Sequence, residues 1–268
     1  MIIEQMLTID GCEINTRIRG KEKSTIIFIH GNSSSARSWD AQLNDEGLSE
    51  AYRLVSFDLP GHGKSSKSHD YRLKEIAKIM PALVDALGLE EYIVVGLSLG
   101  TCLAAEAAPK LKGCKGFVMV SPNIVSNDYS PASFFIPLPP LTALTAEKVD
   151  DDVLNQFISL LVFNDKMIAK EYSMSYLNTD PEFRVALGQT IATGDWSDEI
   201  ANIQHTGLPI CIVFGREEKA INTDYLDKFE PKWRDRVFFI EKAGHFANAE
   251  QPDPFNDLLK EFAKDVFK

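Results

Sequence analysis

The sequence predicts an α/β protein with a mostly parallel β-sheet, helices on both faces of the sheet and one helical insertion. Short apolar runs alternate with helical patterns along most of the 268 residues, and these runs are apolar at nearly every position. Continuous apolarity is typical of a strand covered on both faces, and strand–helix alternation is typical of a parallel sheet. The alternation stops between about residues 122 and 205, which indicates the insertion.

Six apolar runs are rich in β-branched and aromatic residues, as strands are. They are "TIIFIH" (25–30), "RLVSFD" (53–58), "YIVVGL" (92–97), "GFVMVS" (116–121), "PICIVF" (209–214) and "RVFFIE" (236–241). Ahead of them, the pair Asp10-Gly11 has the composition of a tight turn and predicts a hairpin at the N-terminus. Such a hairpin would add antiparallel strands at one edge of the sheet.

Apolar residues recur at helical spacing in residues 71–89, so we expect a helix over this range. In the insertion, the proline-rich stretch "SPASFFIPLPPL" (130–141) precedes amphipathic patterns such as "DDVLNQFISLLVF" (151–163). We interpret residues 122–204 as a helical cap on a core domain formed by residues 1–121 and 205–268. The alternative is a second independent domain. A segment of this length is more easily stabilised by packing against apolar residues of the main domain than by a core of its own.

The composition, with 44% hydrophobic and 25% charged residues, is ordinary for a soluble globular protein. A formal net charge of -11 argues against nucleic acid or an anionic membrane as partner and favours a small neutral substrate. The sequence has no basic and apolar leader pattern, four scattered cysteines and no close histidine pair. We therefore expect a cytoplasmic protein, monomer or homodimer, with reduced thiols and no metal site.

Gly63-Lys64-Ser65 is the triplet that ends a phosphate-binding P-loop. The P-loop pattern also requires a glycine five positions before Gly63, and that position is Asp58. The backbone cradle for a phosphate is therefore not encoded, and a nucleotide-dependent enzyme is a weak alternative.

Ser98 is the candidate nucleophile. It lies at the centre of Gly96-Leu97-Ser98-Leu99-Gly100, directly after a predicted strand and before the helical run "LGTCLAAEAA" (99–108). In this context G-x-S-x-G predicts a nucleophile elbow, in which a strained turn exposes the serine hydroxyl. Small residues two positions away let strand and helix approach, and the helix N-terminus favours a developing anion.

A serine nucleophile needs a base that is held by a third group. His245, in "AGHFANAEQP" (243–252), follows the last predicted strand and is the candidate base, with a capped loop histidine as the plain alternative. The acid should follow the preceding strand, where Glu217 and Glu218 are adjacent. We select Glu218 because it lies three residues after Gly215, and we expect Glu217 to be solvated. The other acid position of this architecture offers only Asn123, which carries no charge.

Acyl transfer also requires hydrogen-bond donors for the oxyanion. The segment "FIHGNSSS" (28–35) supplies a glycine-containing turn after a strand, and we expect the backbone amides of Asn32 and Leu99 to form the oxyanion hole. Gly31 and the Asn32 side chain could contact substrate, although a simple turn role for that side chain is equally open. Among the other histidines, His30 is interpreted as a structural residue. His62, His69 and His205 are interpreted as surface residues.

These segments together resemble the α/β-hydrolase superfamily over essentially the whole chain. The matching stretches are "HGN" (30–32), "DLPGHGKS" (58–65), "GLSLG" (96–100), "FGREE" (214–218) and "GH" (244–245). The resemblance implies an α/β-hydrolase fold with an eight-stranded sheet, a helical cap and no cofactor. It also implies that Gly61, Gly63 and Ser65 belong to a structural loop rather than to a phosphate site.

A narrower resemblance is to the α/β-hydrolase type of N-acyl-homoserine lactonase. It rests on "HGNSSS" (30–35) followed by Trp39 and Gln42, on "DLPGHGKS", and on a glutamate in a G-R-[DE]-E setting. The cap lies outside this resemblance. A serine nucleophile also separates the chain from haloalkane dehalogenases and epoxide hydrolases, which attack with an aspartate.

The sequence therefore predicts a cofactor-free serine hydrolase of carboxylic esters or lactones, with Ser98, His245 and Glu218 as its triad. An N-acyl-homoserine lactone is one candidate substrate. Aromatic cap residues would wall an apolar acyl site or simply pack the lid, and the candidates are Phe134, Phe135 and Phe157. Fold does not fix function, so a receptor-like or slow-turnover protein remains an alternative, as does a C–C bond hydrolase or perhydrolase.

Overall fold

The computed structural model describes residues 1–227 and 229–268. Within them, eight strands form one sheet in the order β1-β2-β4-β3-β5-β6-β7-β8. The strands from β3 onward pair in parallel, whereas β1 pairs antiparallel with β2, and β2 with β4. The predicted mostly parallel sheet is confirmed. The strand bounds are β1 (Ile3–Ile9), β2 (Cys12–Arg19), β3 (Thr25–Ile29), β4 (Arg53–Phe57), β5 (Tyr92–Leu97), β6 (Cys114–Val120), β7 (Ile210–Gly215) and β8 (Val237–Ile240).

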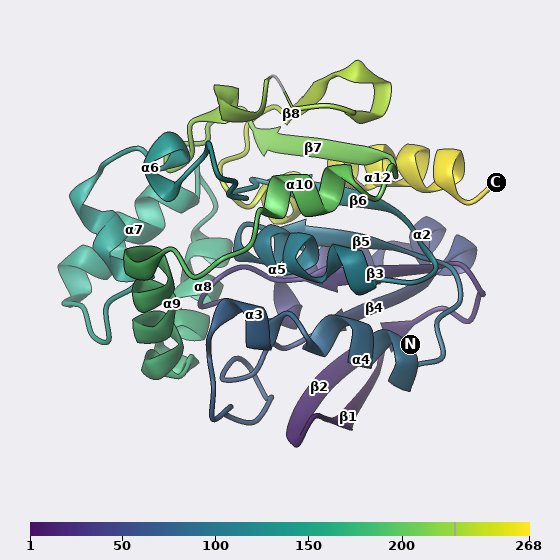
Figure 1. The fold of residues 1–268 in the computed structure, drawn as a ribbon, viewed down its shortest axis with the longest axis horizontal. Helices are drawn as coiled ribbons and strands as arrows, with labels where there is room; N and C mark the ends of the chain where they lie inside the picture. Colours follow the sequence, from purple (N-terminus) through teal and green to yellow (C-terminus); the bar gives the residue numbers. More distant parts are fainter. Residues whose placement is uncertain (228) are drawn as a thin grey trace.

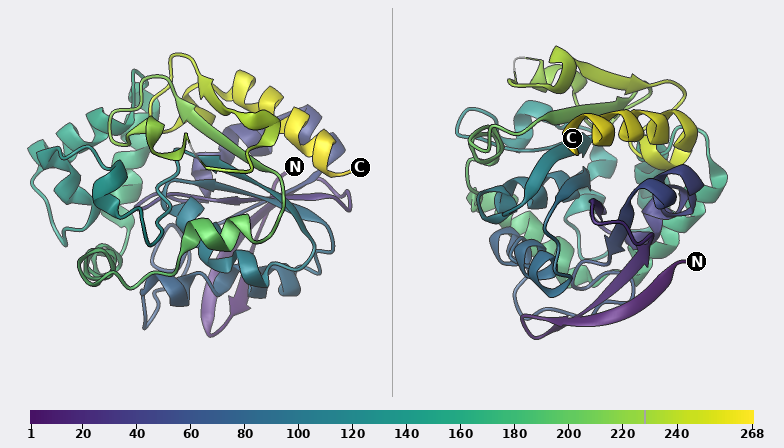
Figure 2. Two further views of the ribbon diagram at one scale, coloured as in Figure 1. Left: turned by 45° about the horizontal axis from the view of Figure 1, so that its top comes forward. Right: turned by 90° about the vertical axis from the view of Figure 1, so that its right-hand side faces the viewer.

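Helices cover both faces of this sheet (Figure 1). The views in Figures 1 and 2 show α4, α5 and α10 over one face and α2 and α12 over the other. Every residue of β3, β5 and β7 is buried, which explains their continuous apolarity. The helices outside the β6–β7 connection are α1 (Asp40–Asn44), α2 (Glu46–Ala51), α3 (Leu73–Ile76), α4 (Ile79–Ala86), α5 (Leu99–Ala107), α11 (Ala247–Glu250) and α12 (Pro252–Val266).

The N-terminal hairpin turns at Asp10 and Gly11, as predicted. Ile9 pairs with Cys12 across this two-residue turn, and Asp10 and Gly11 have φ angles of 48° and 80°. A type I′ turn needs a positive φ at both central residues, which aspartate and glycine tolerate well. The hairpin forms one edge of the sheet, far from the strand ends that carry the candidate site.

The single helix predicted over residues 71–89 is wrong, because two short helices occupy this range. α3 ends at Ile76 and α4 begins at Ile79. Pro81 has no amide hydrogen to donate to the carbonyl of Ala77, four residues earlier, and that carbonyl instead accepts from Met80 at 3.2 Å. The two helices still share a neighbour, because both α3 and α4 pack on α5, and α4 also contacts β1.

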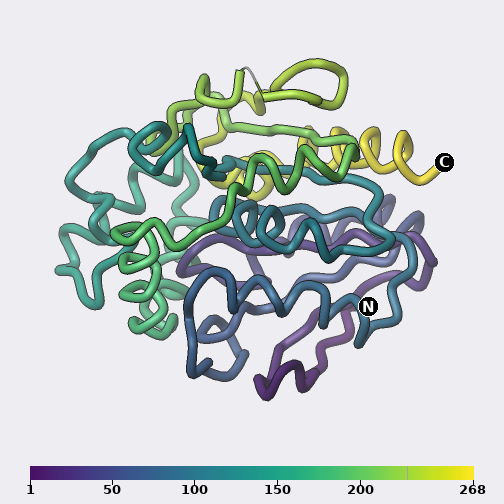
Figure 3. The backbone as a smooth tube through the Cα atoms, viewed as in Figure 1, coloured from purple at the N-terminus to yellow at the C-terminus, as the bar shows by residue number. Residues whose placement is uncertain are grey.

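The long connection between β6 and β7 is helical. Figures 1 and 3 show most of its teal and green course gathered beyond the end of the sheet at which the parallel strands terminate. α10, which the predicted cap range includes, packs instead on α5 over the sheet. The elements of this connection are α6 (Pro131–Phe134), the 3₁₀ helix η3 (Pro139–Leu144), α7 (Asp151–Leu161), α8 (Lys166–Asn178), α9 (Pro181–Thr193) and α10 (Glu199–Gln204).

The loop that resembles the end of a P-loop is organised around Asp58. The Asp58 carboxyl group accepts hydrogen bonds from the Ala36 amide at 2.7 Å, the Lys64 amide at 2.9 Å and the Asn15 side chain at 2.8 Å. A Cβ atom on Gly63 would lie 2.3 Å from this carboxyl group. The ammonium of Lys64 points elsewhere and pairs with Glu4 at 2.9 Å.

His62 lies inside the protein, so its predicted surface position is wrong. Its Nε2 accepts from the Ser33 amide at 3.2 Å, its Nδ1 lies 3.0 Å from the Pro60 carbonyl, and its ring meets Phe183 edge-on. Burial lowers the pKa of His62 well below its ordinary value, so the ring is neutral. Polar neighbours in the sequence concealed this packing. His69 and His205 are exposed, as predicted.

His30 has a similar structural position at the end of β3. Its Nε2 accepts from the Leu59 amide at 3.0 Å, and its Nδ1 lies 2.8 Å from the Gly31 carbonyl. Burial lowers the pKa of His30, so it serves as a neutral link between two loops.

No helix in the described residues is both long enough and apolar enough to cross a membrane.

Candidate active site

Ser98 occupies a sharp turn between β5 and α5. Its φ of 52° and ψ of -118° are unusual for a residue with a side chain and indicate local strain. A Cβ atom on Gly96 would lie 2.6 Å from the Gly100 carbonyl oxygen, and one on Gly100 would lie 2.4 Å from that of Ile29. Both positions therefore require glycine for the strand and helix to pack this closely. The turn is held by the Ser98 amide, which donates to Val120 at 2.9 Å.

His245 is held by Glu218. The Nδ1 of His245 lies 2.7 Å from Oε2 of Glu218, whose side chain is fully buried. The other oxygen of Glu218 accepts from the amides of Ala220 at 2.9 Å and Ile221 at 3.4 Å. This pairing fixes the ring so that Nε2 is left to act as a base, as in a serine triad.

The surroundings of Glu218 keep it ionised. Burial acts to raise its pKa, but the charge and hydrogen bond of His245 and the Ala220 amide act the other way. The net result is that the pKa of Glu218 lies below its ordinary value. A buried carboxylate in this position stabilises a positively charged imidazole.

Glu217 and Asn123 do not reach His245. Glu217 is partly exposed, and its amide donates to the Ala243 carbonyl at 2.8 Å. The Asn123 side chain instead lies 3.2 Å from the Cys102 sulfur and 3.4 Å from the Thr101 hydroxyl. The structure therefore brings Glu218, of these three candidates, to the imidazole.

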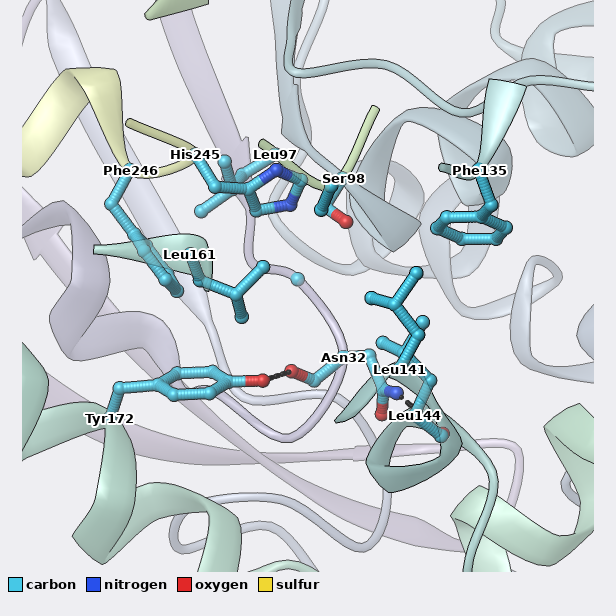
Figure 4. Close-up of a pocket in the computed structure, with 12 residues that line it drawn as sticks. Asn32, Leu97, Ser98, Phe135, Leu141, Leu144, Leu161, Tyr172, His245 and Phe246 are labelled. Atoms are coloured by element: carbon cyan, nitrogen blue, oxygen red, sulfur yellow. Dashed lines mark hydrogen bonds between the residues drawn. The ribbon is translucent and has the colours of Figure 1, made fainter. Parts of the chain in front are cut away.

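Ser98 and His245 line the same small cavity, which has a volume of about 20 Å³. Figure 4 shows the imidazole next to Ser98, with the Ser98 hydroxyl directed into the cavity. No hydrogen bond joins these two side chains in the part of the chain that the structure describes. Catalytic hydrogen bonds are often long before substrate binds, so the arrangement is compatible with a nucleophile and its base.

The two backbone amides predicted to form the oxyanion hole, those of Asn32 and Leu99, belong to segments that flank Ser98. The Asn32 loop packs directly on the elbow, since a Cβ atom on Gly31 would lie 3.4 Å from the Ser98 Cβ. Leu99 is the first residue of α5, where amides lack intrahelical partners and the helix dipole is positive. Neither the Asn32 nor the Leu99 amide donates a hydrogen bond to another described residue.

The Asn32 side chain ties the core to the β6–β7 connection. Its Nδ2 donates to the Leu144 carbonyl at 2.9 Å, and the backbone carbonyl of Asn32 accepts from the Tyr172 hydroxyl at 3.1 Å (Figure 4). Sequence reasoning missed Tyr172, which lies on α8 within an ordinary helical pattern. Both contacts place Asn32 at the junction of elbow, η3 and α8.

A second cavity, of about 50 Å³, is also lined by Ser98 but not by His245. Asn32, Phe135 and Leu144 line both cavities, and Phe134 lines the second. Phe157 is not brought to either: it is fully buried, with the rings of Tyr172 and Tyr176 at 6.1 Å and 6.3 Å. Each cavity has room for about one or two water molecules, so a larger ligand requires the cap to shift.

The family comparison agrees with this architecture. The sequence model described as "Alpha/beta hydrolase family" matches residues 26–258. A similar curated protein is the dihydrolipoyllysine-residue acetyltransferase component of the acetoin cleaving system of Cupriavidus necator. It is 26% identical over 264 residues, which cover 96% of this chain and 68% of that protein. The 2-hydroxy-6-oxononadienedioate/2-hydroxy-6-oxononatrienedioate hydrolase of Comamonas testosteroni is 24% identical over 255 residues, covering 90% and 88%.

Solved structures share the fold. N-acyl homoserine lactonase AidH, complexed with N-butanoyl homoserine, matches with a TM-score of 0.90 and 24% identity, covering 99% of this chain and 97% of that one. A putative aryl esterase from Burkholderia cenocepacia matches with a TM-score of 0.82 and 21% identity, covering 99% of both chains. The eight-stranded sheet, the helices on both its faces and the family match together show that this chain belongs to the alpha/beta hydrolase family.

Proposed function

We propose that the chain is a serine hydrolase that cleaves carboxylic esters or lactones. The observation that carries this proposal is the buried Glu218 carboxylate, 2.7 Å from Nδ1 of His245, beside the cavity into which the elbow presents Ser98. Nucleophile, base and acid thus come from three loops at the carboxyl ends of the parallel strands, where open α/β sheets bind ligands.

In the proposed reaction, the Ser98 hydroxyl attacks the substrate carbonyl while Nε2 of His245 accepts its proton. Glu218 stabilises the imidazolium, and the amides of Asn32 and Leu99 bind the oxyanion. His245 then returns the proton to the leaving alcohol as the C–O bond breaks. A water molecule, deprotonated by His245, attacks the acyl-enzyme and releases the acid. In a lactone the alcohol and acid remain in one product.

We also propose that helices α6–α9 and η3 of the predicted cap, residues 122–204, cover this site, whereas α10 belongs to the layer over the sheet. Helices α6–α9 lie beyond the ends of the parallel strands, and side chains from this segment contribute much of the cavity walls (Figures 1 and 4). Phe134, Phe135 and Leu144 would contact an apolar acyl group. Because the present cavities are small, we infer that α6–α9 and η3 move to admit substrate.

The test is a substrate screen of the purified protein. Acyl esters of graded chain length would be followed by alcohol release, and N-acyl-homoserine lactones by the fall in pH on ring opening. We expect turnover of at least one series and covalent labelling of Ser98 by a fluorophosphonate. Tight ligand binding without labelling or turnover would instead indicate a receptor-like protein.

A second candidate, hydrolysis of a carbon–carbon bond next to a ketone, is favoured by one observation. The Comamonas testosteroni relative, which is named as a hydrolase of oxo-dienedioate and oxo-trienedioate compounds and so of ketones, aligns over 90% of this chain. Ser98, His245 and Glu218 could serve that chemistry as well. Ketone substrates of this type, added to the screen, would distinguish the two reactions by which class is turned over faster.

A further inference from the structure

A second fully buried glutamate, Glu199, lines the 50 Å³ cavity, which Ser98 also lines but His245 does not. It is the first residue of α10, and one carboxyl oxygen, Oε2, accepts from the Val125 amide at 2.9 Å. The other oxygen, Oε1, has no hydrogen-bond partner among the described residues. Leaving a buried polar atom unpaired is destabilising, so this oxygen calls for an explanation.

The rest of the cavity wall is mostly apolar. The Asn123 side chain, which also lines it, is already within 3.2 Å of the Cys102 sulfur and 3.4 Å of the Thr101 hydroxyl. Among the described residues that line this cavity, Glu199 is the one with a fully buried side-chain oxygen that lacks a hydrogen-bond partner. The apolar lining includes Leu73, Leu99, Val125, Phe134, Leu187 and Trp196. An apolar pocket with one such polar group is typical of a site that orients a mainly apolar ligand.

Glu199 differs from most carboxyl groups in its charge state. Burial raises the pKa of Glu199 to about 8, and the nearby acidic side chains of Glu106 and Asp198 act in the same direction. At neutral pH the group is therefore a carboxylic acid, with one O–H to donate. With Oε2 engaged by Val125, this proton belongs on Oε1.

We propose that Glu199 is a specificity-determining residue whose carboxyl group binds an oxygen atom carried on the apolar chain of the substrate. The inference rests on the proposed function, because Ser98 fixes which end of the substrate reacts. The substrate class is then an ester or lactone whose acyl chain bears a keto, hydroxyl or amide oxygen. A site built to form a hydrogen bond discriminates against the analogue that lacks the partner.

The test compares p-nitrophenyl hexanoate with analogues in which one chain methylene is replaced by a carbonyl group at successive positions. For wild type we expect kcat/KM for at least one keto ester to exceed that for hexanoate by about 10-fold or more. Glu199→Leu should bring the ratio of kcat/KM for that keto ester to kcat/KM for hexanoate close to one, while retaining hexanoate hydrolysis. Glu199→Gln should keep the ratio, because its amide can accept from Val125 and still donate.

Glu106→Gln is the matched control, since Glu106 binds the Ser197 amide and hydroxyl outside the cavity. We expect it to keep the wild-type ratio. A wild-type ratio equal to that of Glu199→Leu, with hexanoate still hydrolysed, would overturn this inference and leave the proposed function standing. No hydrolysis of any ester and no fluorophosphonate labelling would overturn the proposed function itself.

A pH profile separates substrate binding from a structural role. As pH rises from about 7 to about 9, the wild-type ratio should fall because ionised Glu199 cannot donate, whereas that of Glu199→Gln should stay level. The groups that face Glu199 are Cys102 and Glu106 on α5, Asp198 before α10, and Tyr225 on η4 (Thr223–Leu226). Burial raises the pKa of Cys102 and of Tyr225 well above their ordinary values, so both stay neutral across this range.

Discussion

The carboxyl groups of Glu218 and Glu199 are both fully buried. Glu218 pairs with His245, which lines one of the two cavities that share Ser98, and Glu199 lines the other; we call these the Glu218 side and the Glu199 side of Ser98. Glu218 faces an imidazole and two backbone amides, and its pKa lies below the ordinary value. Glu199 accepts from one amide and lies near Cys102, Tyr225 and two further acids, and burial raises its pKa to about 8. The charge of a buried carboxyl group is therefore decided by its partners, because the cost of desolvation acts on both.

This difference gives the two sides of Ser98 different chemistry. On the Glu218 side, a fixed negative charge can stabilise a cation that forms during the reaction. On the Glu199 side, a neutral acid can donate to a neutral ligand without placing a charge in an apolar pocket. The following predictions test this contrast.

The largest effect is expected from Ser98→Ala, which removes the group between the two sides. We expect kcat to fall by about 10⁴-fold or more, because no other hydroxyl replaces the nucleophile. Ester hydrolysis by the purified variant measures this, with circular dichroism as the check on folding. Turnover within about 10-fold of wild type would rule out the proposed mechanism.

On the charged side, Glu218→Gln should lower kcat by about 10³-fold, because an amide neither fixes the same tautomer nor stabilises the imidazolium. Glu217→Gln is the matched control, one residue away and partly exposed, and should change kcat by less than about 3-fold. Steady-state kinetics of the two variants decide the assignment. The reverse order of effects would transfer the role of acid to Glu217.

The two glutamates should also give stability opposite dependences on pH. The folded state holds a proton on Glu199 between the ordinary pKa of 4.5 and about 8, so this residue reduces stability as pH rises through that range. Glu199→Gln removes the penalty and should stabilise the protein by about 3 kcal/mol at pH 7, and by little near pH 4. Urea unfolding at the two pH values measures the difference.

Glu218 supplies the comparison for that experiment. Its lowered pKa contributes stability above the ordinary pKa of 4.5, and this is lost as pH falls through the lowered value. The stability advantage of wild type over Glu218→Gln should therefore shrink on acidification. Parallel pH dependences for the two variants would contradict the contrast between the sites.

The smallest effect concerns Asn32, which lines both cavities. Asn32→Ala removes the 2.9 Å hydrogen bond to Leu144 and should cost about 1 kcal/mol of stability. We expect KM to rise by about 3-fold with kcat little changed, since the backbone amide remains. The control is Asn178→Ala, which removes an exposed hydrogen bond to the Gly63 carbonyl. A fall in kcat as large as that of Glu218→Gln would mean that the Asn32 side chain acts directly in the reaction.

Much of the fold could be predicted because it depends on local patterns. The strand runs have continuous apolarity, the Asp10-Gly11 turn has its own signature, and G-x-S-x-G follows a strand. Glu218 was selected by its spacing from Gly215, and the structure explains that glycine: a Cβ atom there would lie 2.0 Å from the Gly244 carbonyl oxygen. The catalytic role of Glu218 stays a prediction.

The residues that sequence reasoning missed depend on tertiary packing. Glu199 follows Asp198, whose side chain caps α10, and such an acidic pair is typical of a solvated helix start. Its burial arises from tertiary neighbours, among them α5, Val125 and Tyr225. In the same way, His62 is covered by Phe183, more than a hundred residues away, and Phe157 is enclosed by two tyrosines of α8. Local patterns carry no information about these partners.

The Asp58 loop has a consequence for how such chains are classified. The amides of Ala36 and Lys64 and the Asn15 side chain already donate to the Asp58 carboxylate. This carboxylate therefore occupies the position that a bound phosphate group would need. The triplet glycine-lysine-serine occurs both in a structural loop of this kind and in nucleotide-binding P-loops. Asp58, at the position where a P-loop has its first glycine, distinguishes this structural loop from a nucleotide-binding one.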